Sequence, residues 1–283
     1  MAIKIIKHSQ QLVTQNGALL WLPASVVGGR ISLPEPDIYS ENSKQIFPLN
    51  TRLEYADGRL FRYGKWGATS TNVPLARMVV NANAAPGATG EEDVDGFEGD
   101  LNTAAVAGQT YVDLQIATAY AENFFEDGML AVYVDSSPAH YVEYRIAGSE
   151  LGNGTYCRVY LDNPGGLKRP ITATEGVTAY KSLFSQLKDA VAEGSTFVSA
   201  MGVCLSSPFT SGYFGWIQRR GRCIITPTAY FGDTANERMA ALHTDGTIIL
   251  YTHTTGEAKH IIGYLTQRTV SGYGDLEVQL MLE

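Results

Sequence analysis

The residues best suited to hold a metal ion form one acidic block, residues 91–100, with the sequence EEDVDGFEGD. Clustered carboxylates are the ligands that Ca²⁺ prefers. In a calcium loop that starts at Asp93, however, the fifth position is Phe97 and the twelfth position is not acidic. The spacing therefore favours a solvated loop, as is usual for such charge blocks, and leaves Ca²⁺ binding by the loop as the alternative.

Histidine is the next residue type that could bind a metal ion. His243 and His253 flank a predicted strand at residues 247–251, so they could meet across a hairpin. A zinc site would need a further ligand, and the spacing supplies none. We therefore expect solvated histidines and no metal site. The histidines of the chain are His8, His140, His243, His253 and His260.

The motifs of common catalytic sites are missing from the sequence. It contains no G-x-S-x-G, no G-x-x-x-x-G-K followed by Ser or Thr, and no H-E-x-x-H. We therefore expect that the protein is not an enzyme, with no catalytic residue and no cofactor. Paired carboxylates that hydrolyse sugars leave no motif, because any two strands can bring them together. A polysaccharide-degrading enzyme thus stays a competing interpretation.

The cysteines and the net charge restrict the possible environment and partners. Cys157, Cys204 and Cys223 are odd in number and form no C-x-x-C pair, so we expect buried, unpaired side chains in a reducing compartment. The formal net charge of −8 opposes a nucleic-acid partner. The chain has neither an apolar run of roughly 18 residues nor a signal-peptide pattern, so no membrane partner is expected.

Short apolar runs joined by turn residues dominate the chain from residue 51 onward. Asp57-Gly58, Asn153-Gly154 and Asp245-Gly246 each lie beside such runs and favour hairpins with type I′ turns. Residues 276–282 alternate apolar and polar side chains, which predicts a strand with one buried face. About a dozen strands of this kind predict an all-β fold with a sandwich or barrel-like body. The body would span residues 49–283, as one domain or two closely packed β subdomains.

One segment of this body departs from the strand pattern. Apolar residues between Leu183 and Val191 recur at helical spacing, and Gly194 could end a helix there. The segment is therefore either the single short helix of the protein or an extended stretch buried on both faces. Trp216 lies in a run that alternates like a buried strand, so we expect it in the core.

Residues 1–48 lack a steady period and contain Pro23, Pro34 and Pro36. Because proline fixes φ and removes a hydrogen-bond donor, the segment is predicted as an extended N-terminal arm. Its apolar content favours an arm that straps onto a partner. The residues expected to contact a partner are Ile5, Ile6, Leu19, Trp21 and Leu22 in the arm, and Tyr63 and Trp66 as exposed aromatic residues, with burial in the sheet as the alternative for the last two.

Residues 47–68 read FPLNTRLEYADGRLFRYGKWGA, and residues 212–223 read GYFGWIQRRGRC. These two segments resemble motifs of a group of structural proteins from tailed-bacteriophage virions, and a looser likeness runs from residue 47 to the end of the chain. Asn50 stands where Gly is commoner in that group. Arg219 and Arg220 interrupt the end of the second motif.

The resemblance implies a head decoration (cement) protein. Such a protein is made in the host cytoplasm, binds the major capsid protein on the outside of the phage head, and stabilises the expanded shell. The resemblance also implies a homo-oligomer, commonly a trimer. The alternative is a tail or fibre component that binds host surface glycans. It would display clustered exposed aromatic rings and carboxylates, but the sequence has neither the heptads nor the repeats of fibre shafts.

Overall fold

The computed structural model is all-β, and the residues it describes contain no helix. By the contacts between its residues, the chain divides into unit 1, residues 1–82 and 184–283, and unit 2, residues 83–183. The second unit is thus inserted into the first. The described residues are 9–23, 33–67, 76–81, 96–117, 119–134, 140–189, 199–205, 210–229, 231, 238–243, 245–252, 260–267 and 276–283.

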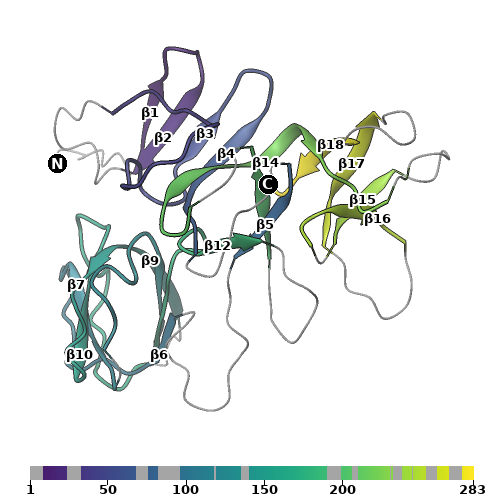
Figure 1. The fold of residues 1–283 in the computed structure, drawn as a ribbon. Coiled ribbons are helices and arrows are strands. Elements are labelled where there is room, and N and C mark those ends of the chain that lie inside the picture. The colour runs from purple at the N-terminus through teal and green to yellow at the C-terminus, as the bar shows by residue number, and fades with distance from the viewer. Residues whose placement is uncertain are drawn as a thin grey trace. The chain divides into compact units, whose positions relative to one another are not determined.

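Unit 1 is built on one antiparallel sheet of twelve strands (Figure 1). The main path runs in the order β1-β2-β3-β4-β14-β18-β17-β15-β16, and β13, β5 and β12 branch from β14. The strands are β1 (Ser9–Val13), β2 (Leu19–Pro23), β3 (Arg52–Glu54), β4 (Leu60–Lys65), β5 (Met78–Asn81), β12 (Leu187–Asp189), β13 (Ala200–Cys204), β14 (Phe214–Ile225), β15 (Met239–Leu242), β16 (Ile248–Leu250), β17 (Ile261–Gln267) and β18 (Leu276–Met281).

The hairpins predicted from the turn residues are present, but the predicted type I′ turns are wrong, because Gly58, Gly154 and Gly246 have a positive φ whereas Asp57, Asn153 and Asp245 do not. β3 and β4 pair antiparallel around Asp57-Gly58, and Tyr55 N donates to Arg59 O at 2.9 Å. Of the residues in this first turn only Gly58 has a positive φ, of 85°. A type I′ turn needs two such residues, so this is the longer hairpin loop in which glycine takes the single left-handed position.

The core of unit 1 is aromatic and brings together segments that are distant in sequence. Tyr63 of β4 lies directly opposite Trp216 of β14, with their ring centroids 5.0 Å apart. Phe47 packs 5.2 Å from Trp216 and 5.3 Å from Tyr63. Such ring pairs add about 0.5–1.5 kcal/mol each beyond the burial of their area. The expected burial of Trp216 is confirmed, because its exposed fraction is 1%.

Unit 2 is a six-stranded sheet that curls so that the chain following one end strand meets the other end strand. Its order is β6-β11-β8-β9-β10-β7. The chain that leaves β6 runs along β7, where Asn102 N donates to Asp113 O at 2.7 Å and Gln115 N donates to Asp100 O at 3.0 Å. These bonds give the curled sheet a barrel-like form, and we call it the barrel. The strands are β6 (Gly96–Gly99), β7 (Tyr111–Gln115), β8 (Met129–Val134), β9 (His140–Ser149), β10 (Tyr156–Leu161) and β11 (Val177–Tyr180).

The strands of unit 2 follow the two-residue period of a half-buried sheet. In β10, Cys157 and Val159 are fully buried, whereas Tyr160 between Val159 and Leu161 is 40% exposed. Inward residues of β7, β8 and β9 are no more than 1% exposed: Val112, Leu114, Leu130, Val132 and Ile146. The interior of unit 2 is therefore filled with apolar side chains.

The structure corrects one prediction about the chain outside the regular strands and decides between the alternatives of another. The arm predicted for residues 1–48 is not separate from the body, because β1 and β2 form a hairpin that joins β3, and Ile38 and Phe47 lie in the core of unit 1. For Leu183–Val191 the helix is not found over the described part, and the extended alternative is, because β12 pairs there with β5. Residues 190–194 lie outside the described residues, as do residues 1–8 and 24–32.

Candidate docking surface

The structure buries both aromatic residues that were expected on the surface. Tyr63 is 0% exposed and Trp66 is 2% exposed, so the prediction that they are exposed contact residues is wrong. Burial, the alternative, is found because Tyr63 lies on the same face of β4 as Phe61 and packs in the aromatic core. The alternation of Phe61 and Tyr63 with Arg62 was the available signal, since residues two apart share a face of a strand.

The predicted contact residues of the arm lie in β2 or outside the described residues. Leu22 is 2% exposed and packs in the core. Leu19 and Trp21 are half-buried, and the period of the strand places them on the opposite face from Leu22. Ile5 and Ile6 fall among residues 1–8, which the structure does not describe.

The candidate metal sites stay predictions. Residues 91–95 of the acidic block and His253 lie outside the described residues, and His243 binds Asp245 at 2.9 Å. Among the residues that the structure describes, no group of three His, Cys, Asp or Glu side chains could hold a metal ion. The three cysteines are free and buried, as predicted.

A cluster of arginines lies on the face of β3 and β4 opposite to Phe61 and Tyr63 and continues into β14. We call it the arginine face. Arg52 and Arg62 lie directly opposite each other in β3 and β4. β14 contributes Arg219 and Arg220 at a register shift in its pairing with β4, and such a bulge re-aims neighbouring side chains. The face comprises Arg52, Arg62, Arg219, Arg220 and Arg222, with Glu54, Glu277 and Glu283.

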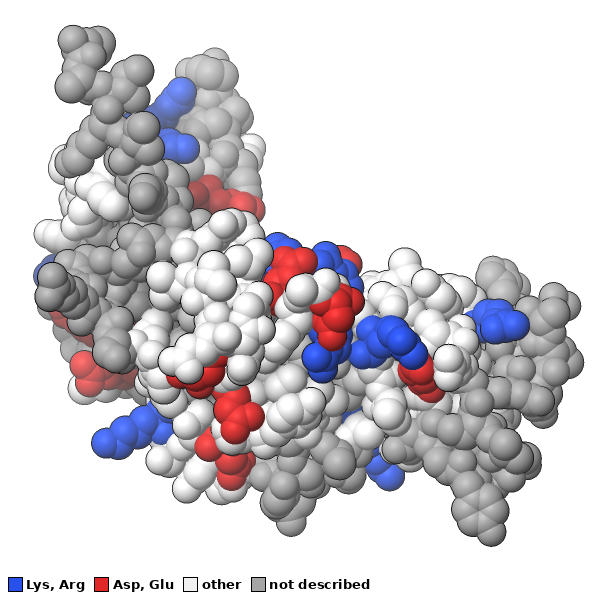
Figure 2. Space-filling view, turned by 90° about the horizontal axis from the view of Figure 1, so that it is seen from above, with Lys and Arg blue, Asp and Glu red and all other residues white. Residues whose placement is uncertain are grey.

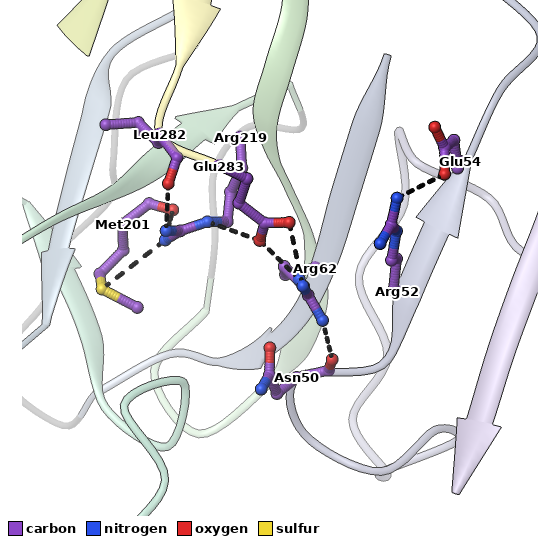
Figure 3. Close-up of polar contacts among 8 residues, drawn as sticks. All are labelled: Asn50, Arg52, Glu54, Arg62, Met201, Arg219, Leu282 and Glu283. Atoms are coloured by element: carbon purple, nitrogen blue, oxygen red, sulfur yellow. Dashed lines mark hydrogen bonds and ion pairs between the residues drawn. The ribbon is translucent and has the colours of Figure 1, made fainter. Parts of the chain in front are cut away.

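Glu283 joins two of these arginines (Figure 3). Arg62 donates to both of its carboxylate oxygens, at 2.7 and 2.9 Å. Nε of Arg219 lies 3.0 Å from Oε1 of Glu283, while its terminal nitrogens donate to Met201 O at 2.7 Å and Leu282 O at 2.9 Å. The end of β18 is thereby fastened to β4, β13 and β14.

The two arginines control the ionisation of Glu283. Burial alone would raise the pKa of this carboxyl group, but the hydrogen bond and charge of Arg62, with the charge of Arg219, lower it below its ordinary value. Burial also lowers the pKa of Arg219, against the opposing effect of Glu283. Glu283 is therefore an anion at neutral pH, and the excess charge of the cluster is positive.

A second group of ion pairs continues the arginine face on both sides. Glu54 accepts from Arg52 at 2.6 Å and from Arg220 at 2.5 Å. Arg52 also stacks over Trp21, 5.4 Å from the ring centroid. Arg222 pairs with Glu277, and the side chain of Arg222 is 66% exposed, the most of these arginines.

The arginine face can dock a macromolecule better than it can bind a small substrate. Met239 and Tyr264 lie opposite each other in β15 and β17 and are 40% and 42% exposed, while Met281 and Ile224 are more exposed still. Five arginines against three glutamates give a local positive excess on a chain whose net charge is −8. Basic and acidic side chains also lie interleaved in the space-filling view (Figure 2). Mixed apolar and arginine-rich surfaces are typical of protein contacts.

From the sequence, Asn50 was noted only as a departure from the first motif, and Arg219 and Arg220 only as departures from the second. The structure gives each of these departures a local reason. Asn50 has a left-handed φ of 66°, a conformation that Gly adopts most easily and that Asn tolerates. Arg219 and Arg220 lie at the bulge and build the arginine face. The pairing of β4 with β14, which the sequence alone did not supply, was needed to find this surface.

Comparisons with protein-family models, with curated proteins and with solved structures find no match for this chain. In the described part of the chain, no helix has the length and apolar character needed to span a membrane.

Proposed function

We propose that this protein is a structural component of a tailed-bacteriophage virion, a decoration protein that binds the outer surface of the head and is not an enzyme. The observation that carries the proposal is the pairing of the two motifs. Residues 60–65 and 214–220 are hydrogen-bonded neighbours in one sheet, and their rings form one core. The resemblance therefore concerns the architecture of unit 1, as expected for a scaffold.

The arginine face supplies the docking surface in this proposal. A shell protein that presents carboxylates would neutralise the excess positive charge of the arginine face. The exposed apolar residues beside the arginines would be buried in the contact and would add to its stability. A protein that binds only the expanded shell stabilises that state by mass action. Many copies, and an oligomer such as the trimer expected from the resemblance, would increase this effect through avidity.

Binding to heads tests the docking surface directly. The protein is added to purified expanded heads that lack it, and the bound fraction is measured by sedimentation. Arg222→Glu should weaken binding about tenfold, equivalent to 1.4 kcal/mol, because it reverses an exposed charge beside Glu277. Lys168→Glu, a charge reversal at an exposed residue of unit 2, is the matched control and should bind like the original protein.

Equal binding by both variants would contradict a docking role for the arginine face. The location of the protein is tested separately, by electron microscopy of virions that carry a tagged copy. A label on the head supports the decoration role. A label on the tail would instead support the tail or fibre component, and the absence of label from the virion would overturn the proposed function.

A further inference from the structure

The outer face of the unit 2 barrel carries an aromatic and charged cluster that the proposed docking function does not use. Three successive residue pairs of β7 and β10 point outward, because the residues between them are fully buried. The pairs are Tyr111 with Tyr160, Asp113 with Arg158, and Gln115 with Tyr156. From the rise per residue of a strand, this platform is about 13 Å long.

The polar groups of the platform are held in fixed positions. Arg158 donates to both oxygens of Asp113, at 2.8 and 3.0 Å, and stacks 4.3 Å from the ring centroid of Tyr111. The hydroxyl of Tyr160 donates to Glu150. Because these side chains stand on paired strands and brace one another, they present a preorganised surface.

The aromatic rings of the platform remain accessible, in contrast to the aromatic core of unit 1. Tyr160 is 40% exposed, and Tyr111 and Tyr156 are half-buried. The ring centroids of Tyr111 and Tyr160 lie 6.4 Å apart with the planes at 61°, so the two rings do not cover each other. The bidentate pair with Asp113 uses two of the five N–H donors of Arg158, whose side chain is 30% exposed.

We propose that this platform binds a neutral oligosaccharide. The C–H faces of a pyranose ring pack on exposed tyrosine rings, and its vicinal hydroxyls match carboxylate acceptors and guanidinium donors that lie side by side. The platform offers the remaining N–H donors of Arg158, and the exposed carboxylate of Glu150 lies at the hydroxyl of Tyr160, whereas the carboxylate of Asp113 is nearly buried and serves to hold Arg158 in place. The positive charge of Arg158 is outnumbered by the negative charges of Asp113 and Glu150, and the net charge of the whole chain is −8. Electrostatic repulsion therefore disfavours an acidic sugar.

The proposal is tested with the full chain and three neutral probes: cellopentaose, maltopentaose and chitopentaose. Saturation-transfer NMR should detect transfer from the protein to ring protons of at least one of them. For that sugar, Tyr160→Ala should raise the Kd at least tenfold, because it removes the most exposed ring of the platform. Tyr160→Phe keeps the ring and loses only the hydroxyl bond to Glu150, so it should bind more tightly than Tyr160→Ala.

Tyr180→Ala is the matched control. Tyr180 is 50% exposed on β11, outside the platform, and its removal should leave the Kd unchanged. No transfer to any of the three sugars would overturn the proposal. A Kd of Tyr160→Ala equal to that of the original protein would overturn it too. Binding of a proline-rich peptide at Tyr160 without binding of sugars would assign the platform to a protein partner and overturn it as well. None of these outcomes bears on binding of the arginine face to heads.

Discussion

Unit 1 and unit 2 are made of the same antiparallel strands but end their sheets in different ways. In unit 1, β1 pairs only with β2 among the described strands, so the sheet stays open at that margin. In unit 2, the chain after β6 hydrogen-bonds to β7, so the end strand β7 has partners on both of its edges. An open sheet can be extended or covered by a partner, whereas a closed one meets partners only through its outward side chains. The surfaces described above differ as well: that of unit 1 is a cluster of five arginines, and that of unit 2 centres on three tyrosines.

The largest effect is expected from a core substitution that destabilises unit 1 and leaves unit 2 folded. Trp216→Ala should lower the free energy of unfolding of unit 1 by about 3–5 kcal/mol, because it removes a buried indole from the aromatic core. The cysteines report each unit separately, since Cys204 and Cys223 are buried in unit 1 and Cys157 in unit 2. Alkylation along a denaturant series, read by mass spectrometry, should show earlier labelling of Cys204 and Cys223 only.

The same cysteines supply the control for that experiment. Burial raises the pKa of Cys157 to about 11 and that of Cys223 to about 12, so both thiols should resist alkylation at neutral pH until their unit unfolds. Leu130→Ala, in the core of unit 2, should reverse the order and label Cys157 first. Simultaneous labelling of all three cysteines in both variants would show that the units unfold as one.

A smaller effect is expected at Gly128 in unit 2. A Cβ atom there would lie 2.0 Å from the carbonyl oxygen of Tyr180 and 2.9 Å from that of Phe125. Gly128→Ala should therefore destabilise unit 2 by about 1–3 kcal/mol through overpacking. Gly154 is the control, because its Cβ would meet nothing within 4 Å and only its φ of 81° opposes a side chain. Gly154→Ala should lower the free energy of unfolding by about 1–2 kcal/mol. Urea unfolding of the two variants checks this prediction, and a larger loss for Gly154→Ala than for Gly128→Ala would contradict it.

The smallest expected effect is a change in how the stability of unit 1 depends on acidic pH. The folded pKa of Glu283 lies below its ordinary value of 4.5, so its ion pairs contribute stability above that value, and the contribution is lost as the pH falls through the folded pKa. Glu283→Gln should remove this part of the acid sensitivity of unit 1, at most about 1 kcal/mol for a pair that solvent reaches. The urea midpoint of unit 1, measured between pH 6 and 3 by tryptophan fluorescence, checks it, because Trp21, Trp66 and Trp216 all lie in unit 1. An unchanged pH profile in the variant would contradict the assignment to Glu283.

The local part of the fold could be predicted from the sequence. Asn153-Gly154 and Asp245-Gly246 mark the β9–β10 and β15–β16 hairpins, and the alternation of residues 276–282 marks β18. The all-β class, the burial of Trp216 and the burial of the cysteines followed from the same patterns. These features depend on neighbours within a few residues, which a period of two and turn chemistry describe well.

The long-range part could not be predicted. The prolines of residues 1–48 suggested an arm, but Leu20 and Leu22 are buried because β2 lies between β1 and β3. The arginine face requires the partner of β4, which is β14, about 150 residues later. The tyrosine platform likewise depends on the pairing of β7 with β10. No local pattern encodes these pairings, so the sites they create were missed.

The insertion of unit 2 into unit 1 sets the order in which the two can be completed during synthesis. All six strands of the barrel lie between residues 96 and 180, so the barrel can form once that stretch has left the ribosome. β4 is made early but acquires its neighbour β14 only later, and β14 in turn acquires β18 at the last residues. The nascent chain thus carries a finished barrel while half of the large sheet still lacks its central strand.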